Sequence, residues 1–510
     1  MTTHVGRVVI IGAGPGDPGL ITARGLRLLG EADVVVYDRA VERMLRWAAP
    51  RAERIAAGSP AERDTAQDAI SMLLAEKARE GHLVARLKWG DPFVFDSGAK
   101  EAMFLFDQRI PFEIVPGVPA AVAASAYAGV PATYPGAGDA LVLLRGQENI
   151  ADPVASVDWR AMAAIDGTLT CFATGVAASI VLQRMIDAGC APDTPAAFIE
   201  HGTLPAQHTL SGSAATLAAS VAAESREPGL LVVGKVAGLR EHLRWFDDRP
   251  LFGKQIVVTR TLEQAGELTD ALEALGAQVL QVPTLRIEAP DDPEAIDRAA
   301  ASVADYNWIV FQSANAATRF LDALLGGPLD LRALGRVLVC AIGPSTADRL
   351  AAAGIRPDTV VAEVGAADRL AEALEAHGPF TGRRVLVVRP DVLRDAVSRE
   401  LERLGAIVTE LVAYRTEPVS PDTPGVQDLY RQLLDGRIDA VTFTSPMAVR
   451  RFTEMIGPEQ AADLLNTTTV AAIGPVTAAA AADLGIESPL VPDTHTVRGL
   501  VQALVEQFRK

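Results

Sequence analysis

The sequence predicts an α/β protein made of several layered domains, and three observations lead to this prediction. The chain has 510 residues, enough for three or four domains of roughly 100–200 residues each. Hydrophobic residues make up 49 % of it and aromatic residues only 5 %, and this Ala-, Val- and Leu-rich composition suits buried parallel strands covered by helices. Short apolar runs alternate with helical patterns, and the second half repeats part of its own order.

Charge and the spacing of cysteines and histidines argue against several classes of protein. A net charge of −17 disfavours binding to nucleic acid or to an anionic membrane surface. The three cysteines are far apart and form no Cys-x-x-Cys pair, which indicates thiols in a reducing compartment. The seven histidines show no ligand spacing, so no metal site is expected. With no leader pattern and no run of about 18 apolar residues, we expect a cytoplasmic protein without a membrane partner.

Apolar runs of strand length mark the first half of the chain, with helical patterns between most of them. These runs are residues 8–11, 34–37, 83–87, 112–115, 140–144, 169–173, 196–199 and 230–233. The stretch 247–253 looks like a linker, and a new buried strand at 255–259 opens the second half. We therefore expect a first domain at 1–246 and a second at 254–510.

A glycine-rich turn directly follows the first predicted strand and precedes a helical pattern at 20–29. Its sequence is Gly12-Ala13-Gly14-Pro15-Gly16-Asp17-Pro18. Such a turn lets a ligand approach bare backbone N–H groups. The dinucleotide fingerprint would need a glycine at position 17, where this chain has an aspartate, so an NAD-dependent oxidoreductase is disfavoured even though Asp38 lies at a suitable distance.

The second half contains an internal repeat. Four segments match four later ones in the same order, with offsets of 129 to 132 residues. The matched pairs are 256–260 with 385–389, 276–279 with 405–408, 310–316 with 442–448, and 340–347 with 471–478. Ordered matches at nearly one spacing predict two similar α/β lobes that face a shared cleft.

Four further segments join the glycine-rich turn: 36–39 (Val-Tyr-Asp-Arg), 86–95 (Arg-Leu-Lys-Trp-Gly-Asp-Pro-Phe-Val-Phe), 111–118 and 125–131. Together they resemble the tetrapyrrole methylase family, most closely its uroporphyrinogen-III C-methyltransferases, over about residues 5–246. The resemblance implies two α/β subdomains, about 1–135 and 136–246, with S-adenosylmethionine bound in the cleft between them. It also implies a homodimer formed through this half.

The resemblance carries roles onto matching residues. Those expected at the cofactor are Gly14, Pro15, Gly16, Asp17, Gly90, Asp91, Val94, Ala120, Thr174 and Gly202. Asp38 matches the proposed base, and Arg86 lies on the strand that leads to the cleft. These residue types suit the implied chemistry, in which a pyrrole carbon attacks the methyl group and a carboxylate takes the released proton. Alone, Asp38 could equally cap the next helix, and Asp91 could start a turn.

Departures from the family pattern fall at the expected ligand positions. The positions concerned are Ser59 (for lysine), Trp89 (for glycine), Pro119 (for threonine), Thr174 (for methionine), and the stretches 96–101 and 133–135. Several of these changes remove basic groups that an octacarboxylate substrate would need, and Trp89 adds bulk where backbone should approach the cofactor. The first half is therefore either an active methylase or a folded scaffold.

The repeated lobes resemble uroporphyrinogen-III synthase over about residues 254–510. The matching motifs are 257–260, 310–316, 341–344, 413–416, 442–446 and 472–478. The resemblance implies one lobe of about 254–283 with 418–510, another of about 284–417, and extended segments near 281–287 and 411–417 that cross between them. The implied reaction converts hydroxymethylbilane to uroporphyrinogen III with inversion of ring D, and it needs no cofactor.

Candidate residues of this half come from the same resemblance. Tyr414 matches a tyrosine proposed to assist departure of the hydroxyl, with a surface hydroxyl as the alternative. The expected substrate contacts are Arg260, Ser313, Ala314, Gly343, Ser345, Thr346, Arg389, Thr444, Ser445, Gly474 and Thr477, with Arg415 as a further carboxylate ligand. The serines and threonines could instead be helix caps, and the arginines could form surface salt bridges.

Three functional hypotheses follow. The chain is a bifunctional enzyme that cyclises and then methylates toward precorrin-2, a synthase on a methylase-like scaffold, or a non-enzymatic protein whose two lobes close on a small molecule. In both enzymatic hypotheses the substrates are small tetrapyrrole molecules. Only an enzyme would yield isomer III above the isomer I that forms spontaneously.

Overall fold

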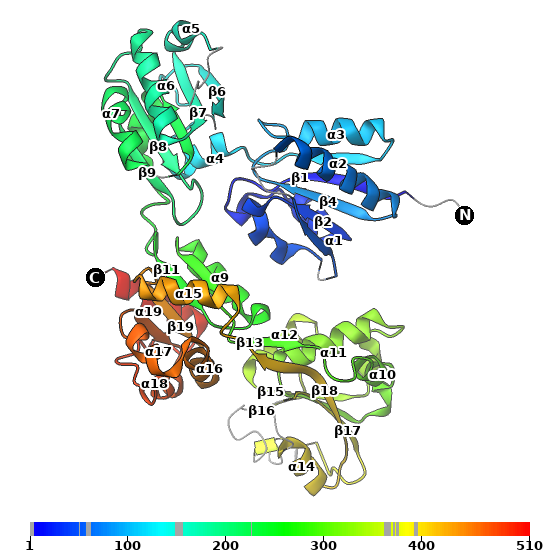
Figure 1. The fold of residues 1–510 in the computed structure, drawn as a ribbon. Coiled ribbons are helices and arrows are strands. Elements are labelled where there is room, and N and C mark those ends of the chain that lie inside the picture. The colour runs from blue at the N-terminus through cyan, green and yellow to red at the C-terminus, as the bar shows by residue number, and fades with distance from the viewer. Residues whose placement is uncertain are drawn as a thin grey trace. The chain divides into compact units, whose positions relative to one another are not determined.

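Four β-sheets carry the fold over the part of the chain that the structure describes. The structure is a computed structural model, and it describes residues 5–49, 51–57, 63–147, 157–225, 227–361, 369–370, 373, 377–391 and 396–509. The chain divides into two compact units, one of Met1–Lys254 with Leu272–Gln278 and the other of Gln255–Ala271 with Val279–Phe508 (Figure 1). Each unit contains two of the sheets. No helix in the described residues is long and apolar enough to cross a membrane.

The first sheet is parallel, with the strand order β3-β2-β4-β1-β5. Its strands are β1 (Arg7–Gly12), β2 (Val34–Tyr37), β3 (Glu53–Ala56), β4 (Leu83–Lys88) and β5 (Phe112–Val115). Because successive side chains of a strand point to opposite faces, the sheet has two apolar faces, and both are covered. One packs against α1 (Ala23–Glu31) and the 3-10 segment Arg39–Trp47, the other against α2 (Arg63–Arg79) and α3 (Gly98–Asp107). The first sheet is therefore the middle of three layers, and the loops that follow its strands all start from the same edge.

The second sheet has the order β6-β7-β10-β8-β9 and is mixed rather than parallel. Its strands are β6 (Ala140–Gln147), β7 (Gly167–Ala173), β8 (Pro195–Glu200), β9 (His208–Ser213) and β10 (Gly229–Val233). Among the hydrogen-bonded neighbours, β6 and β7 pair in parallel, whereas β10 pairs antiparallel with both β7 and β8. One face packs against α6 (Gly175–Asp187) and α7 (Ala214–Glu224), and α5 (Trp159–Ala163) lies beside α6. The apolar composition indicates buried strands but does not fix their direction.

The other face of the second sheet is covered by α4 (Ala120–Tyr127). Ala121 and Ala124 of this helix pack against Ile199 and Val232, so α4 belongs to the core of the second subdomain. The boundary between the subdomains thus lies before residue 120, earlier than the expected change near 135. The expected linker 247–253 is also packed: Leu251 is fully buried, and Asp247 forms an ion pair with Arg240 at the start of α8 (Arg240–Leu243).

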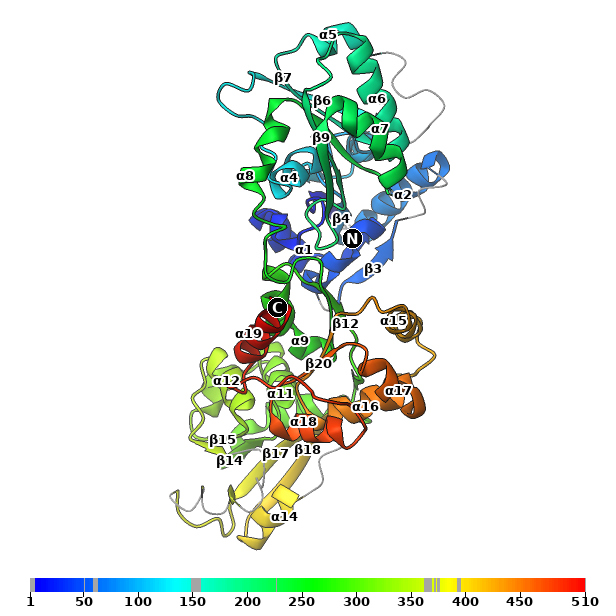
Figure 2. The same ribbon diagram turned by 90° about the vertical axis from the view of Figure 1, so that its left-hand side faces the viewer.

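In the second unit, one sheet has the order β12-β11-β19-β20. Its strands are β11 (Gln255–Val258), β12 (Gln278–Gln281), β19 (Ala440–Phe443) and β20 (Thr469–Ala472), so the first strand of this half joins strands from its end. The helices of this lobe are α9 (Leu262–Ala274), α15 (Pro424–Leu434), α16 (Pro446–Ile456), α17 (Pro458–Leu465), α18 (Pro475–Ala482) and α19 (Val497–Phe508) (Figure 2). Helices α15 to α17 cover the core that Phe443 and Phe452 share.

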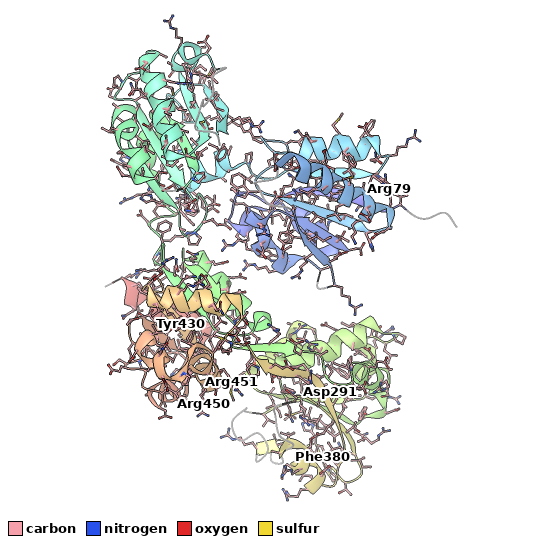
Figure 3. All side chains as sticks on the ribbon, viewed as in Figure 1. Arg79, Asp291, Phe380, Tyr430, Arg450 and Arg451 are labelled. Atoms are coloured by element: carbon pink, nitrogen blue, oxygen red, sulfur yellow. The ribbon has the colours of Figure 1, made fainter. Side chains whose placement is uncertain are left out.

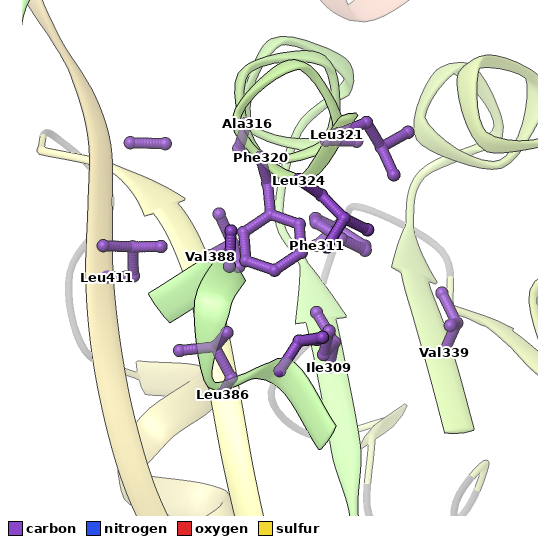
Figure 4. Packing of buried hydrophobic residues seen from close by; sticks show 14 of the residues in the cluster. Ile309, Phe311, Ala316, Phe320, Leu321, Leu324, Val339, Leu386, Val388 and Leu411 are labelled. Atoms are coloured by element: carbon purple, nitrogen blue, oxygen red, sulfur yellow. The ribbon is translucent and has the colours of Figure 1, made fainter. Parts of the chain in front are cut away.

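The other sheet of the second unit has the order β13-β18-β17-β14-β15-β16. Its strands are β13 (Leu285–Glu288), β14 (Trp308–Phe311), β15 (Leu338–Ile342), β16 (Thr359–Val361), β17 (Arg384–Pro390) and β18 (Ile407–Pro418). Phe320 of α11 (Ala314–Gly326) packs on Phe311 and Val388, with α10 (Ala295–Ala301) and α12 (Pro344–Ala352) on the same face (Figure 4). The opposite face packs against α14 (Ala396–Arg403).

The two crossing segments expected between the lobes form a paired ribbon. The end of β18 pairs antiparallel with β13, and its beginning pairs parallel with β17. The register matches Leu285 with Pro418 and Glu288 with Arg415. Strand β18 thus pairs with β17 of the lobe sheet at its start and with β13 of the connecting ribbon at its end.

Candidate functional sites

Three loops at the carboxyl edge of the first sheet meet through their glycines. The loop after β1 pairs with the loop after β4, because Gly14 N–H donates to Gly90 O at 3.2 Å and Gly90 N–H donates to Gly14 O at 2.9 Å. Both glycines have positive φ angles, 77° and 67°, which other residues rarely adopt. A Cβ on Gly117 would lie 2.1 Å from Gly90 O, and one on Gly12 would lie 2.5 Å from Gly117 N. The chain has glycines here because three backbones touch.

Asp91 holds the third of these loops in place. Its Oδ2 accepts a hydrogen bond from Gly117 N at 3.0 Å, and its Oδ1 accepts one from Phe93 N at 2.8 Å. The turn-forming role considered for Asp91 is thus present in the structure, together with a contact between loops. Val94 N–H donates to the Asp91 carbonyl at 3.3 Å, so Val94 belongs to the same turn.

The loop after β8 closes the cradle from the second subdomain. Asp17 N–H donates to Thr203 Oγ1 at 3.1 Å, and Asp17 Oδ2 accepts from the Tyr127 hydroxyl at 2.7 Å. Burial and the bond to Asp17 raise the pKa of Tyr127. His201 and Thr203 have positive φ angles of 48° and 73°, a strained geometry that is often found at functional sites. Asp17 therefore joins the two subdomains.

The remaining residues expected at the cofactor are Ala120, Thr174 and Gly202 of the second subdomain and Gly16 of the first loop. Ala120 begins α4 and is buried, and a Cβ on Gly202 would lie 2.3 Å from the Ala124 side chain, so the Gly202 loop sits directly on α4. Thr174 caps α6 by accepting from Ala177 N at 3.2 Å, which explains a threonine at this position. Gly16 lies against the Leu204 side chain. Ser59 lies outside the described residues.

Asp38 and Arg86 form an ion pair at the same edge. Arg86 Nη2 donates to Asp38 Oδ1 at 2.6 Å, and Asp38 Oδ2 accepts from the backbone N–H of Trp89 at 3.3 Å. The Asp38 side chain is 29 % exposed, whereas that of Arg86 is 2 % exposed. Asp38 begins the 3-10 segment but makes no side-chain cap there, so the capping alternative is wrong. The Asp38 carboxylate is partly exposed and is held in place by the buried Arg86 guanidinium, so it could accept a proton from a ligand at this edge.

Behind Arg86 lies a buried charge cluster that the sequence motifs did not single out. Glu101 is fully buried, and its Oε1 accepts from Arg86 Nε and Lys88 Nζ, both at 3.2 Å. Lys88 Nζ also lies 3.0 Å from Asp96 Oδ1. Although burial alone would raise it, the charges of Arg86 and Lys88 lower the pKa of Glu101. The available signal was the presence of two cations, Arg86 and Lys88, in an otherwise apolar strand.

Trp89 lies beside the glycine cradle and contacts its first loop. Its indole Nε1 donates to the carbonyl of Pro15 at 2.8 Å, so it occupies a loop that was expected to contact the cofactor. Its ring meets Phe172 of β7 edge to face, with 5.9 Å between ring centroids. The side chain remains 37 % exposed. Trp89 thus links the first subdomain to the second at the expected donor site.

In the second unit, the expected substrate residues lie where strands turn into helices. Ser313 and Ser445 cap α11 and α16 in the same geometry, each accepting from the N–H three residues later at 3.1 Å. Ala314 begins α11, and Thr444 precedes the second cap. The capping alternative is therefore confirmed for both serines. The N-termini of these helices still direct unpaired N–H groups outward.

The other two turns begin α12 and α18. Gly343 has a φ angle of 86°, and Ser345 beside it is exposed. Thr346 and Thr477 are 1 % and 3 % exposed, so their side chains face the protein core. A ligand at these turns would meet backbone N–H groups. Gly474 lies against the His495 ring, 3.3 Å from where its Cβ would be.

Tyr414 is buried, and its hydroxyl lies 3.0 Å from Ser313 Oγ. The ring packs in the core of the β13–β18 sheet, and the Arg319 guanidinium lies 6.0 Å from its centroid. The alternative of a surface hydroxyl on Tyr414 is therefore wrong. The structure brings the expected acid to the cap of α11, the helix whose first residues were expected to bind substrate.

The three candidate arginines differ in their partners. Arg389 Nη2 donates to Glu410 Oε2 at 2.8 Å, and Arg415 Nη1 donates to Asp291 Oδ1 at 2.8 Å, with Asp291 in the loop after β13 (Figure 3). These two thus form the salt bridges considered as their alternative. Arg260 forms no such pair in the described part of the chain.

None of the expected residues lines the 660 Å³ hollow between β12, β13 and α15, which is bordered by Gln281, Arg286, Val426 and Gln432. Within the described ranges there is no group of three or more His, Cys, Asp or Glu side chains that could hold a metal ion.

Comparisons with known proteins place both halves. The family model described as tetrapyrrole (corrin/porphyrin) methylases matches residues 7–218, and that of uroporphyrinogen-III synthase HemD matches residues 266–502. A porphyrin biosynthesis protein HemD of Ruminiclostridium josui is 32 % identical over 504 residues, which cover 98 % of each chain. The chain belongs to the HemD family. It is a fusion of a methylase and a synthase of tetrapyrrole biosynthesis, as the two resemblances predicted.

Further similarities concern one half at a time. A siroheme synthase of Neisseria meningitidis is 42 % identical over 245 residues, 48 % of this chain and 50 % of its own. A solved uroporphyrin-III C-methyltransferase of Thermus thermophilus, in complex with S-adenosyl homocysteine, is 34 % identical and matches 46 % of this HemD-family chain and 100 % of its own, with a TM-score of 0.40. The four sheets and the helices that cover them confirm the predicted α/β fold class. Membership of an enzyme family sets the non-enzymatic alternative aside.

Proposed function

We propose that the second half cyclises hydroxymethylbilane to uroporphyrinogen III with inversion of ring D, and that the first half then methylates this product at carbons 2 and 7. The observation that supports the cyclisation best is the Tyr414 hydroxyl, 3.0 Å from the Ser313 cap of α11. This phenol can donate a proton to a departing hydroxyl, and the helix N-terminus beside it can hold a substrate carboxylate. Water then leaves and the ring closes without a redox partner.

The first half could hold S-adenosylmethionine through backbone groups of its glycine-containing loops. Gly12 and Gly117 leave no room for a Cβ, Gly90 has a positive φ angle that favours glycine, and the three loops meet at one edge of the sheet. When bound, the cofactor supplies an electrophilic methyl group. Asp38, fixed by Arg86, would accept the proton that the substrate carbon releases. Trp89, hydrogen-bonded to Pro15, competes for the same loop. We place the protein in the cytoplasm, with tetrapyrroles as its small-molecule substrates and a homodimer formed through the first half.

A coupled assay tests both activities in the full chain. The protein is incubated with hydroxymethylbilane and methyl-labelled S-adenosylmethionine, and the isomer ratio and the label are scored separately. We expect isomer III above the spontaneous isomer I, with label in the tetrapyrrole. Isomer III without label would leave a synthase on a methylase scaffold. Isomer I alone would refute the cyclisation.

Replacing Tyr414 by phenylalanine should slow cyclisation several-fold or more, because the hydroxyl beside Ser313 is lost while the buried ring remains. The measurement is the rate of isomer III formation at saturating hydroxymethylbilane. A matched control is Tyr430→Phe on α15, which removes a hydroxyl bonded to Gln460 in the other lobe (Figure 3). Unchanged turnover in Tyr414→Phe would remove this residue from the mechanism.

A further inference from the structure

The internal repeat places two arginines at equivalent points of the two lobes. Arg260 follows β11, and Arg389 lies near the end of β17, 129 residues later. Each of these strands has a neighbour from the same part of the repeat, β12 beside β11 and β18 beside β17. The two positions can therefore be compared side chain by side chain.

Arg389 is neutralised within its own lobe. Its Nη2 and Nε donate to Glu410 Oε2 at 2.8 and 3.2 Å, and its Nη1 donates to the carbonyl of Pro390 at 3.0 Å. Glu410 stands on β18, the neighbouring strand. This guanidinium has its charge and most of its donors satisfied before any ligand arrives.

Arg260 lacks the corresponding partner. The repeat places Gln281 of β12 where the other lobe has Glu410, and this amide is neutral and donates to Thr269 Oγ1 at 2.9 Å. Arg260 Nε is buried and, among the described residues, without a hydrogen-bond partner. Burial lowers the pKa of Arg260, against the attraction of Glu267. A guanidinium stays charged even so, which makes an unpaired one costly.

Thr261 adds a second unsatisfied group at the same turn. Its Oγ1 is also buried and has no hydrogen-bond partner within the described ranges. Thr261 directly precedes α9, whose N-terminal dipole favours an anion. The equivalent position in the other lobe is Pro390, which has no hydroxyl. Arg260 Nε and Thr261 Oγ1 are two neighbouring buried atoms without partners in the described part of the chain, and together they indicate a missing oxyanion.

We propose that the Arg260–Thr261 turn binds a carboxylate of the linear tetrapyrrole substrate, and that the equivalent turn at Arg389 does not. The proposal rests on the cyclisation proposed above. A carboxylate accepts two N–H bonds from a guanidinium and one O–H bond from a hydroxyl, which is the set of donors at this turn. In a chain with a net charge of −17, a cation without an ion-pair partner among the described residues provides a local attraction for a polyanion.

Two variants of the full chain test the site. Arg260→Gln removes the cation, and Gln281→Glu supplies the carboxylate that the other lobe already has, so that Arg260 is neutralised in place. Each should raise the KM for hydroxymethylbilane roughly tenfold, the effect of one charge-assisted contact, with kcat within about twofold. Arg332→Gln removes an exposed arginine paired with Asp330 and should change KM less than about twofold.

A second measurement separates this proposal from the proposed function. Fluorescence titration with uroporphyrin III, an octacarboxylate, needs no turnover, and we expect both variants to bind it more weakly and Arg332→Gln to bind it like the parent. If the parent forms no isomer III but Arg260→Gln still weakens this binding, the cyclisation fails and the carboxylate site stands. Unchanged KM and binding in Arg260→Gln, or an equal loss in Arg332→Gln, would overturn the site.

Discussion

Replacing Glu101 by alanine is expected to destabilise the first unit by about 3–5 kcal/mol, the usual cost of removing one partner from a buried ion pair. One oxygen of this carboxylate accepts from four side chains: Arg86 and Lys88 at 3.2 Å, Gln67 at 2.9 Å and Ser97 at 3.3 Å. Both cations are almost completely buried, and alanine would leave them facing a cavity. The measurement is the denaturant concentration at which the first unit of the full chain is half unfolded.

Asp96→Asn is the matched control, because it removes a second carboxylate from the same cluster. Burial raises the pKa of Asp96 against the opposing charge of Lys88. A carboxyl group whose pKa is raised by folding costs stability at neutral pH, where it must be ionised. Asp96→Asn should therefore leave the midpoint unchanged or increase it, although the ion pair with Lys88 is lost.

The dependence on pH distinguishes Glu101 further. Because folding lowers its pKa, its contribution is fully present above the unfolded value of about 4.3 and disappears as the pH falls through the lower folded value. The stability gap between the parent and Glu101→Gln should therefore narrow below about pH 4. Equal destabilisation by Glu101→Ala and Asp96→Asn would show that Glu101 is no more important to the cluster than Asp96, which would contradict this prediction.

The sequence predicted most strands, for a clear physical reason. Buried parallel strands are continuous apolar runs, and the eight expected runs of the first half coincide with β1, β2, β4, β5, β6, β7, β8 and β10. The two that were missed, β3 and β9, are sheet edges with largely exposed side chains, so they carry no apolar run. The antiparallel direction of β10 depends on long connections, which local patterns do not encode.

The candidate sites were predictable where backbone geometry demands a residue type and unpredictable where partners are distant in sequence. Gly14 and Gly90 could be recognised because their positive φ angles strongly favour glycine. The bond between Asp17 and Tyr127 spans 110 residues, and nothing near either residue indicates it. The difference between Arg260 and Arg389 likewise depends on residues of neighbouring strands, so both had to be predicted alike.

Replacing Trp89 by glycine, the residue of the family pattern, is expected to increase affinity for S-adenosyl homocysteine about tenfold. The indole donates to Pro15 O at 2.8 Å and meets Phe172 at 5.9 Å, so a ligand in the glycine cradle must displace it or pack around it. Accommodating extra bulk in a packed site typically costs 1–3 kcal/mol, which spans this factor. Calorimetric titration of the full chain measures the change directly.

Trp245→Ala provides the control, because this indole makes the same kinds of contact but packs on Tyr127 rather than on the glycine loops themselves. Its Nε1 donates to Ala126 O at 3.0 Å, and its ring meets Tyr127 edge to face at 5.0 Å. Losing these contacts should lower stability slightly and leave binding unchanged. Tighter binding in Trp89→Gly alone would mean that Trp89 restricts the donor site. Weaker binding would instead make the indole a wall of that site, and the chain's departure from the family pattern would then be an adaptation for the donor.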